Sequence, residues 1–516
     1  MGYILPAVSG ILLALSFPKA GLSFLAWVAL VPLLVSLSGK PGRLAFRYGF
    51  ASGMAFYMAS VYWVINTMHN YGGLPYIVSI PLLVLLSAYM ALYVGLFAWL
   101  FGAVRERSAG AAVFAAPALW ASLELVRNYA LSGFPWDLLG YSQHNNLTVI
   151  QVADITGVYG VSALIVLINA ALAYIISMRM TGEAASLKRL SYPVAAALIL
   201  AAVLGYGRYR LAGAAYTPDG SGEGYKVSLV QGNIEQFHKW DPDYQDEVIE
   251  AYRGLTLEAA KSRPDLIIWP ETATPFYFQD MPRRLELQET VRKAGTFLLT
   301  GSPAYESVGE PDEEKFLDFN SAYLMSPDGE VAGRYNKMHL VPFGEYVPLK
   351  TLLPFVSKMV TSIGDFGRGT EYTVLEAGRG RFGTAICFEV IFPELVRRFA
   401  DNGANFLVSI TNDAWFADSA APYQHFNMSV FRAVENRRAM VRAANTGITG
   451  IILPTGEVSA RTDIFTRTAL TGEIPLVTEK TFYTRYGDVF AYLCVLLSAG
   501  FIAFAFRKDQ SLSPRA

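Results

Sequence analysis

The sequence predicts a multi-span α-helical membrane bundle joined to an extracytoplasmic α/β layered domain. Charged residues make up 16% of the chain, whereas soluble chains carry about a quarter. The deficit falls before about Leu211, and residues from about Glu223 to Glu479 have the composition of a soluble domain. We therefore predict a transmembrane bundle of about seven spans at residues 1–212, a soluble domain at 223–480 and a C-terminal transmembrane helix at 486–507.

Apolar segments that are candidate membrane spans run through the first part of the chain and recur at its end. A helix that crosses a bilayer needs about 20 mostly apolar residues. The candidates are residues 3–17, 22–37, 48–68, 76–104, 111–126, 159–178, 192–211 and 489–506. The first segment has no basic residues before it and no small-residue cleavage site after it, so we do not interpret it as a signal peptide.

Lys and Arg are concentrated in every second loop between these segments, which predicts the orientation of the chain. The basic loops carry Lys40, Arg43 and Arg47, then Arg105 and Arg107, then Arg179, Lys188 and Arg189, and the tail carries Arg507, Lys508 and Arg515. The alternate loops are nearly free of them, with Arg208 and Arg210 as the main exception. This pattern places both termini in the cytoplasm and the soluble domain on the outer side. The net charge of -1, without a basic patch, gives no reason to expect nucleic acid as a partner.

The soluble part alternates short β-branched runs with helical patterns, which is typical of an α/β layered domain. Strands are expected at residues 226–230, 265–269, 296–300, 322–325, 382–386 and 405–410, and helices at 243–260 and 392–402. Active sites in such domains gather at the carboxyl ends of strands.

Three predicted strand segments lead to residues that can carry chemistry. The run at 265–269 leads to Glu271, the segment 333–345 presents Lys337 and then Glu345, and the run at 382–386 leads to Cys387. Taken singly, each has an ordinary interpretation: a capping carboxylate, a solvated lysine, or a small buried hydrophobic residue.

Together these residues fit catalysis by a thiol nucleophile. A thiol that attacks an ester or amide must be activated, a carboxylate can accept its proton, and an ammonium can stabilise the oxyanion. A helix predicted to follow Cys387 from Pro393 would favour the thiolate at its N-terminus. Cys494 lies in the last apolar segment, so no disulfide is expected and Cys387 is a free thiol. The five histidines lack the spacing of a zinc site, so we predict no metal.

Several motifs resemble those of a known family. WPET at 269–272, NKMHLVPFGEYVP at 336–348 and AICFE at 385–389 resemble the Glu–Lys–Cys blocks of the nitrilase, or carbon-nitrogen hydrolase, superfamily. VQGNI at 230–234, NDAWF at 412–416 and AVENRR at 433–438 add to this. With the membrane segments, GFPW at 133–136 and TRYGD at 484–488, the whole chain is similar to the apolipoprotein N-acyltransferase family.

The resemblance implies a fold and a reaction. Residues 223–480 would form a nitrilase-like α-β-β-α sandwich. The Cys387 thiolate would take a fatty acyl chain from a membrane phospholipid as a thioester. The α-amine of the N-terminal diacylglyceryl-cysteine of an apolipoprotein would then attack that thioester, in lipoprotein maturation. The enzyme would be a multi-pass protein of the bacterial inner membrane, with its catalytic domain on the periplasmic side and no cofactor.

The resemblance also implies residue roles. Glu271 would be the base and Lys337 the oxyanion partner, while Glu345 would orient Lys337 or handle a proton. Trp240, Phe388 and Glu389 match positions that the family uses around the site. Phe388 departs from the tyrosine common there and Met338 from a basic residue, which leaves the triad intact.

Two other functions compete with this one. A membrane-tethered nitrilase-type amidase acting on a small C–N substrate would share the triad, but tethering needs only one span. A multispan transporter or scaffold with an inactive accessory domain would not need Glu271, Lys337 and Cys387.

Residues 349–363 carry apolar side chains at helical spacing, which predicts an amphipathic helix. Two interpretations stay open: an ordinary helix on the domain core, or a mobile arm that dips into the outer leaflet and covers the active site.

Overall fold

The computed structural model describes residues 2–182, 186–213, 224–308, 315–347 and 366–507. The chain divides into a helical unit, built from residues 1–62, 80–209 and 488–516, and an α/β unit, built from residues 63–79 and 210–487. The amphipathic helix predicted at 349–363 lies outside the described residues.

The helical unit contains the predicted membrane segments. Its α-helices are α1 (Ile4–Leu15), α2 (Ala26–Ala29), α3 (Val31–Ser36), α4 (Gly42–Ser60), α6 (Tyr76–Arg107), α7 (Ala109–Tyr129), α8 (Leu147–Ile150), α9 (Ala153–Met180), α10 (Leu187–Ala212) and α17 (Val489–Phe506). Within the described residues, 5 helices are long and apolar enough to cross a membrane: Tyr76–Arg107, Ala109–Ser132, Ala153–Met180, Leu187–Ala212 and Val489–Phe506. The predicted class, a membrane bundle, agrees with this, but about seven spans and a C-terminal helix were predicted. The apolar segments at 3–17 and 22–37 form only shorter helices in the described residues.

Burial separates inner from outer helices of this unit. In α7 and α9, which pack on each other, 67% of the most apolar window is buried, against 11% in α10 and 17% in α17. Exposed apolar side chains such as Leu198 and Leu496 cover the outer helices. A bilayer accommodates such faces, because all backbone polar groups of a helix are satisfied internally.

The third predicted span is shorter than expected. The sequence predicted a helix to residue 68, but α4 ends at Ser60, and α5 (Val64–Asn66) and the π-turn η2 (Thr67–Tyr71) belong to the α/β unit. Trp63 Nε1 donates to Gln424 Oε1 at 3.0 Å, and the Tyr71 ring packs on Phe237 and Trp415. Contacts with the α/β unit therefore end the apolar run that the sequence extends.

Two six-stranded sheets form the centre of the α/β unit. The first has the order β12-β1-β2-β3-β4-β5 and the second β11-β10-β9-β8-β7-β6. Strands β1–β3 are parallel, as are β7–β9, and the outer strands pair antiparallel. The bounds are β1 Tyr225–Gln231, β2 Leu266–Ile268, β3 Phe297–Val308, β4 Lys315–Met325, β5 Val331–Asn336, β6 Val374–Ala377, β7 Gly380–Ile386, β8 Phe406–Thr411, β9 Met440–Ala444, β10 Gly450–Ile452, β11 Val458–Arg461 and β12 Thr468–Ile474.

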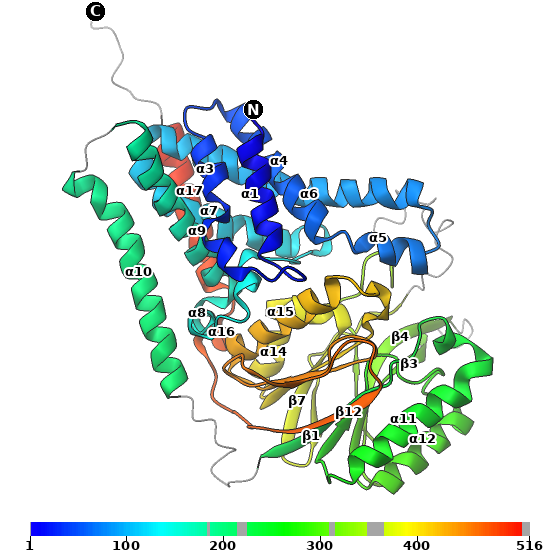
Figure 1. The fold of residues 1–516 in the computed structure, drawn as a ribbon. Helices are drawn as coiled ribbons and strands as arrows, with labels where there is room; N and C mark the ends of the chain where they lie inside the picture. The colour runs from blue at the N-terminus through cyan, green and yellow to red at the C-terminus, as the bar shows by residue number, and fades with distance from the viewer. Residues whose placement is uncertain (1, 183–185, 214–223, 309–314, 348–365, 508–516) are drawn as a thin grey trace, which may run out of the picture. The chain divides into compact units, whose positions relative to one another are not determined.

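Helices cover the outer face of each sheet, which makes an α-β-β-α sandwich (Figure 1). Helices α11 (Gln245–Ala260) and α12 (Met281–Ala294) lie on the first sheet, and α14 (Pro393–Asp401) and α15 (Ala421–Asn436) on the second; α16 (Phe482–Tyr486) packs on α14 and α15. Buried on both faces, the central strands read as continuous apolar runs, as in β8. The predicted fold class, a helical bundle plus a nitrilase-like sandwich, is confirmed.

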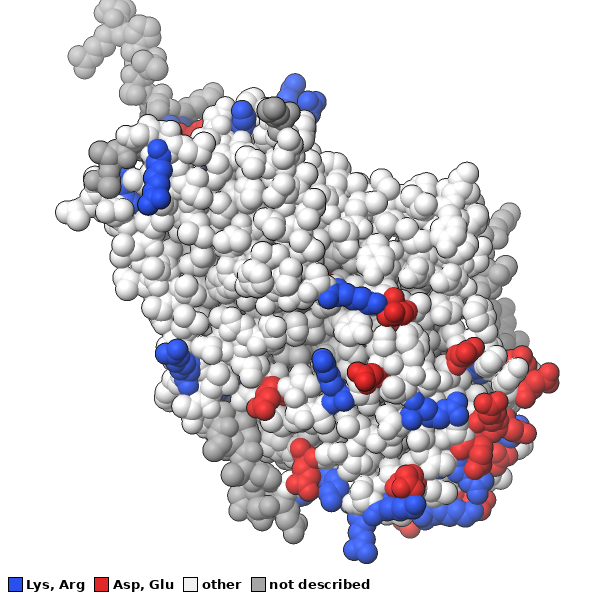
Figure 2. Space-filling model, in the orientation of Figure 1, with Lys and Arg blue, Asp and Glu red and all other residues white. Residues whose placement is uncertain are grey.

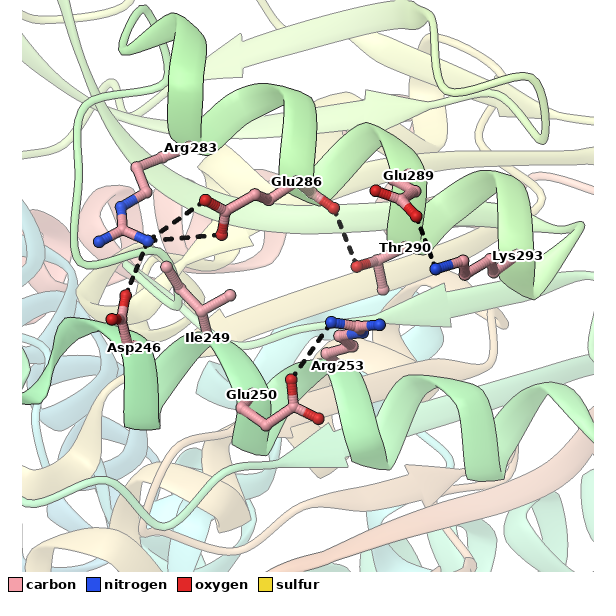
Figure 3. Close-up of a pocket in the computed structure, with 9 residues that line it drawn as sticks. All are labelled: Asp246, Ile249, Glu250, Arg253, Arg283, Glu286, Glu289, Thr290 and Lys293. Carbon is pink, nitrogen blue, oxygen red and sulfur yellow. Dashed lines mark hydrogen bonds and ion pairs between the residues drawn. The ribbon is translucent and has the colours of Figure 1, made fainter.

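Charged side chains crowd one part of the α/β unit. On the face shown in Figure 2 they gather over α11 and α12. A groove of about 420 Å³ between these helices is lined by charged residues that pair with each other, including Arg283 with Asp246 at 2.7 Å and Lys293 with Glu289 at 2.6 Å (Figure 3). These pairs are typical of a solvated surface, and we do not interpret the groove as the functional site.

Candidate active site

Glu271 is held by a tight turn at the carboxyl end of β2. Trp269 N–H donates to Leu299 O and Ala273 N–H to Gly301 O, each at 2.8 Å, so the turn is fixed to β3. A Cβ at Gly301 would lie 2.5 Å from Pro270 O and 2.7 Å from Glu271 Cα. Only glycine therefore lets β3 pass this close beneath the carboxylate.

Cys387 follows β7 directly and is held in the left-handed region, with φ +53°. Such a backbone costs a non-glycine residue about 1–3 kcal/mol and is often found at functional sites. As a whole residue, Cys387 is partly exposed. Cys387 begins the short 3₁₀ turn η7 (Cys387–Ile391), and α14 starts only at Pro393. The helix predicted from Pro393 is therefore confirmed, and the short turn η7 separates it from Cys387.

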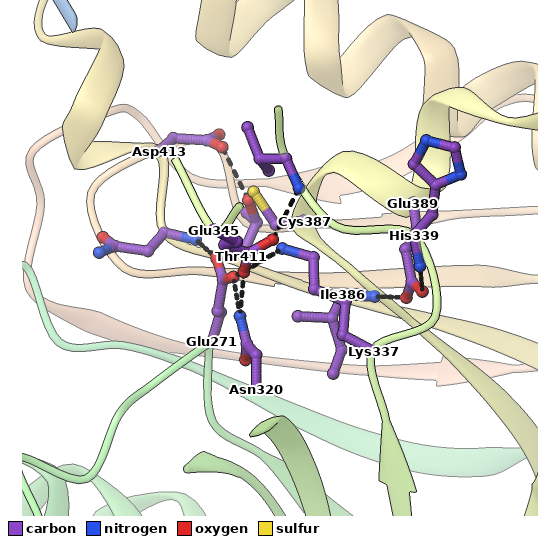
Figure 4. A network of polar contacts seen from close by, with 12 residues as sticks. Glu271, Asn320, Lys337, His339, Glu345, Ile386, Cys387, Glu389, Thr411 and Asp413 are labelled. Atoms are coloured by element: carbon purple, nitrogen blue, oxygen red, sulfur yellow. Dashed lines mark hydrogen bonds and ion pairs between the residues drawn. The ribbon is translucent and has the colours of Figure 1, made fainter. Parts of the chain in front are cut away.

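The predicted residues Glu271, Lys337 and Glu345 lie in one hydrogen-bonded network with Asn320 (Figure 4). Lys337 follows β5, and its Nζ lies 2.8 Å from Glu345 Oε1 and 3.4 Å from Glu271 Oε1. Asn320 on β4 donates its Nδ2 hydrogens to Glu271 Oε1 at 2.8 Å and Glu345 Oε1 at 2.9 Å. The second Glu271 oxygen accepts the Asn412 N–H at 2.8 Å. The first sheet thus supplies both carboxylates and the ammonium, and the second supplies the thiol.

The charges in this network shift the pKa values of its members. Burial alone would raise the pKa of Glu271, but Lys337, Asn320, Lys239 and the Asn412 N–H lower it below its ordinary value. Burial works against the Lys337 ammonium, but Glu345 and then Glu271 raise its pKa overall. Burial and then the Glu271 charge raise the pKa of the Cys387 thiol, and Lys337 opposes them. An ionised carboxylate therefore faces a protonated thiol, the starting state for general-base activation.

Glu389, predicted as a supporting residue, joins the cysteine turn to the lysine segment. Its Oε1 accepts hydrogen bonds from Tyr335 Oη at 2.8 Å and from the N–H groups of Met338 at 2.7 Å and His339 at 3.0 Å. Its Oε2 accepts the Ile386 N–H at 2.8 Å. One buried carboxylate therefore fixes the residues that flank both Lys337 and Cys387.

The other two predicted supporting residues, Phe388 and Trp240, follow Cys387 and Lys239 directly in the chain. Phe388 is buried, and its ring packs on His339 and Phe392. Trp240, in the turn η5 (His238–Trp240), is about half exposed.

Sequence reasoning missed several residues that the fold brings to the site. Asn320 lies within a strand and belongs to none of the motifs, so no local pattern could identify it. Asn412 and Asp413 lie inside the NDAWF motif, whose side chains were not singled out. Lys239 precedes Trp240 and donates to Glu271 O at 3.1 Å.

A buried charged pair lies behind the cysteine turn. Arg442 Nη2 donates to Asp413 Oδ2 at 2.8 Å, and His425 Nδ1 lies 3.1 Å from Asp413 Oδ1. His425 Nε2 lies 3.1 Å from Cys387 O, and since a carbonyl only accepts, this nitrogen carries the hydrogen. Despite burial, Arg442 and then His425 lower the pKa of Asp413 to about 2. No group of three His, Cys, Asp or Glu suited to a metal ion occurs among the described residues.

Comparison with known proteins identifies the family. The model of the apolipoprotein N-acyltransferase N-terminal domain matches residues 9–171, and the carbon-nitrogen hydrolase model matches residues 226–482. The apolipoprotein N-acyltransferase of Geobacter metallireducens is 48% identical over 98% of this chain and 96% of its own length. The chain belongs to the apolipoprotein N-acyltransferase family.

Other members of the family match over a similar extent. The apolipoprotein N-acyltransferases of Methylococcus capsulatus and Pasteurella multocida are 34% and 32% identical, each over 98% of this chain and 96% of their own length. The chain is therefore an acyltransferase with a carbon-nitrogen hydrolase domain, and this favours acyl transfer over the amidase alternative.

Proposed function

We propose that the chain transfers a fatty acyl chain from a membrane phospholipid to the α-amine of the N-terminal diacylglyceryl-cysteine of apolipoproteins, through a thioester on Cys387. The observation that carries the proposal is the convergence of Glu271, Lys337 and Cys387 in a chain related along its whole length to enzymes of that name. Phospholipid and apolipoprotein are then its partners.

In the first step Glu271 acts as the base. Its carboxylate takes the Sγ proton while the sulfur attacks the ester carbonyl carbon of the phospholipid. The C–S bond forms, the ester C–O bond breaks, and the leaving alkoxide takes the proton from Glu271. Lys337 stabilises the oxyanion, and Glu345, at 2.8 Å from Lys337 Nζ, orients that ammonium.

In the second step the neutral α-amine attacks the thioester carbonyl carbon. The C–N bond forms and the C–S bond breaks, and Glu271 passes the amine proton to the sulfur. The thioester must be shielded from water between the steps, since hydrolysis would waste the acyl chain. We assign Glu389 to fixing the two catalytic segments and Trp240 and Phe388 to the lining of the site.

The proposed setting is the bacterial inner membrane, with several spans and the α/β unit on the periplasmic side. The apolar helices of the helical unit and the alternation of basic loops support this arrangement. Both substrates are lipids of the outer leaflet, so a catalytic domain on that side meets their reactive groups. An amidase that acts on a small soluble substrate would not need so extensive a membrane region.

Purified protein in phospholipid vesicles tests the proposal. A synthetic lipopeptide with an N-terminal diacylglyceryl-cysteine should gain the mass of one fatty acyl chain. The same lipopeptide with an acetylated α-amine should stay unmodified, because it has no nucleophile. Release of free fatty acid without transfer, or hydrolysis of small amides at a comparable rate, would instead identify a hydrolase.

A further inference from the structure

Lys239 is a second buried lysine beside the catalytic residues. It is 2% exposed, although its neighbours Phe237 and Trp240 are 70% and 49% exposed. Its Nζ donates to the main-chain oxygen of Glu271 at 3.1 Å. The turn η5 therefore directs one ammonium inward, against the residue that we assign as the base.

The surroundings of Lys239 differ from those of Lys337. Lys337 lies against two carboxylates, whereas the Glu271 carbonyl is the acceptor found for Lys239 Nζ among the described residues. Burying an ammonium without a carboxylate hydrogen bond is costly. A methionine would fill similar space without that cost, so the charge itself needs an explanation.

The segment that carries Lys239 is fixed to the site by side-chain amides. Ile234 N–H donates to Asn445 Oδ1 at 2.9 Å, Asn445 Nδ2 to Asn412 Oδ1 at 3.0 Å, and Asn412 Nδ2 to Gln236 Oε1 at 2.7 Å. Asn412 also binds the Glu271 carboxylate through its N–H. The same amides therefore hold the Lys239 segment and the base in one arrangement.

We propose that Lys239 is a positioning residue whose buried ammonium fixes the Glu271 turn and adds positive charge beside the base and the Cys387 thiol. The inference rests on the proposed function, which makes Glu271 the base for Cys387. The thiol proton moves from Sγ to a Glu271 oxygen, and Lys239 itself gains and loses no proton. Its charge favours the thiolate that forms in that step.

The pKa of Lys239 agrees with this role and provides a test. Burial lowers the pKa of Lys239 to about 8, while Glu271 and then Cys387 oppose the shift. The ammonium form therefore predominates at neutral pH and is lost as the pH rises past that value. Among the described residues, the charges of Glu271, Lys337 and Asp413 act on the thiol. Glu345 contacts Lys337, Glu389 accepts the Ile386 N–H, and His425 and Arg442 contact Asp413.

Alkylation of Cys387 by iodoacetamide measures thiolate reactivity without either lipid. The full-length protein in detergent should carry Cys494→Ser, so that one thiol remains. In Lys239→Met, Cys387 should be alkylated about tenfold more slowly at pH 7, because a rise of about one unit in the thiol pKa lowers the thiolate fraction about tenfold. The difference from the parent should shrink above the Lys239 pKa, because the parent then loses the charge too. Lys239→Arg should keep the parent rate at pH 7 and react faster than the parent above the Lys239 pKa, because the guanidinium keeps its charge there.

Two further variants separate charge from structure. Lys226→Met, at a lysine of β1 that is about one-third exposed and pairs with Glu473, should leave the profile unchanged. Lys239→Gln retains a donor for the Glu271 carbonyl but no charge, so it should match Lys239→Met and replaces it if that variant does not fold. The proposal would be overturned if Lys239→Gln or Lys239→Met were alkylated at the parent rate at pH 7, or if either were slower than the parent by the same factor at every pH. It would also be overturned if alkylation of Lys239→Arg were slowed as much as that of Lys239→Met. If the parent alkylates as expected but transfers no acyl chain, the proposed function fails instead.

Discussion

Replacing Glu389 with Gln should disconnect the two catalytic segments. Three donors reach one carboxylate oxygen and the Ile386 N–H reaches the other. In either orientation the new NH₂ group would face at least one buried donor. A buried donor without an acceptor costs about 1–3 kcal/mol. Burial raises the pKa of Glu389 to about 7, so at pH 8 its carboxylate is ionised and its hydrogen bonds are worth about 1 kcal/mol more than neutral ones. We therefore expect a loss of about 3–5 kcal/mol, on the order of 10 °C in Tm for a domain of this size.

The assay is thermal unfolding in detergent, followed by tryptophan fluorescence, together with the rate of thioester formation at a temperature where the variant is folded. Glu376→Gln is the matched control, because Glu376 is an exposed strand carboxylate paired with Arg381 at 3.1 Å and should contribute less than about 1 kcal/mol. Thioester formation by Glu389→Gln should fall at least about tenfold, since displaced catalytic groups lose their alignment. If Glu389→Gln has the same Tm as Glu376→Gln and forms the thioester at the wild-type rate, the bridging role of Glu389 is refuted.

Three further perturbations test separate parts of the account. Cys387→Ser should abolish transfer with the fold retained, and Cys494→Ser should be nearly silent; turnover by purified Cys387→Ser would refute covalent catalysis by this residue. Glu271→Gln should suppress thioester formation. A fall in the wild-type rate between about pH 8 and about pH 6 should follow Glu389, whose pKa burial raises to about 7, and not Glu271, whose pKa lies below its ordinary value; thioester formation by Glu271→Gln at the wild-type rate would show a different base. A reporter active only outside the cytoplasm should be active when fused near Gly220 and inactive after Arg515, and the reverse pattern would overturn the orientation.

The strand pattern predicted that Glu271, Lys337 and Cys387 lie close together, and their catalytic roles stay a proposal. Glu271 and Cys387 each follow a short apolar or β-branched run, whereas Lys337 follows the mixed strand Val331–Asn336. Carboxyl ends of strands gather at one edge of an α/β domain. The alternation of runs also predicted the layered fold, because the central strands are buried on both faces and read as continuous apolar segments.

Tertiary contacts decided what the sequence could not show. Lys239 lies in a turn without periodicity, and only the folded chain shows that it is buried while Phe237 and Trp240 are exposed. Asn320 is a polar strand residue, and its role follows from its hydrogen bonds to the Glu271 and Glu345 carboxylates, which only the folded chain brings to it. The end of the third span was mispredicted because Trp63 and Tyr71 are apolar in composition but pack on the α/β unit.

The mass of the peptide that contains Cys387, measured during turnover, tests directly whether a thioester forms on this residue. Protein incubated with phospholipid should become heavier by one fatty acyl chain, and proteolysis should locate the addition on the peptide that contains Cys387. Adding the diacylglyceryl lipopeptide should discharge the adduct and place the same chain on the peptide α-amine. Transfer to the lipopeptide while Cys387 stays unmodified in rapidly quenched samples, or an adduct that the lipopeptide does not discharge, would contradict a thioester intermediate on this residue.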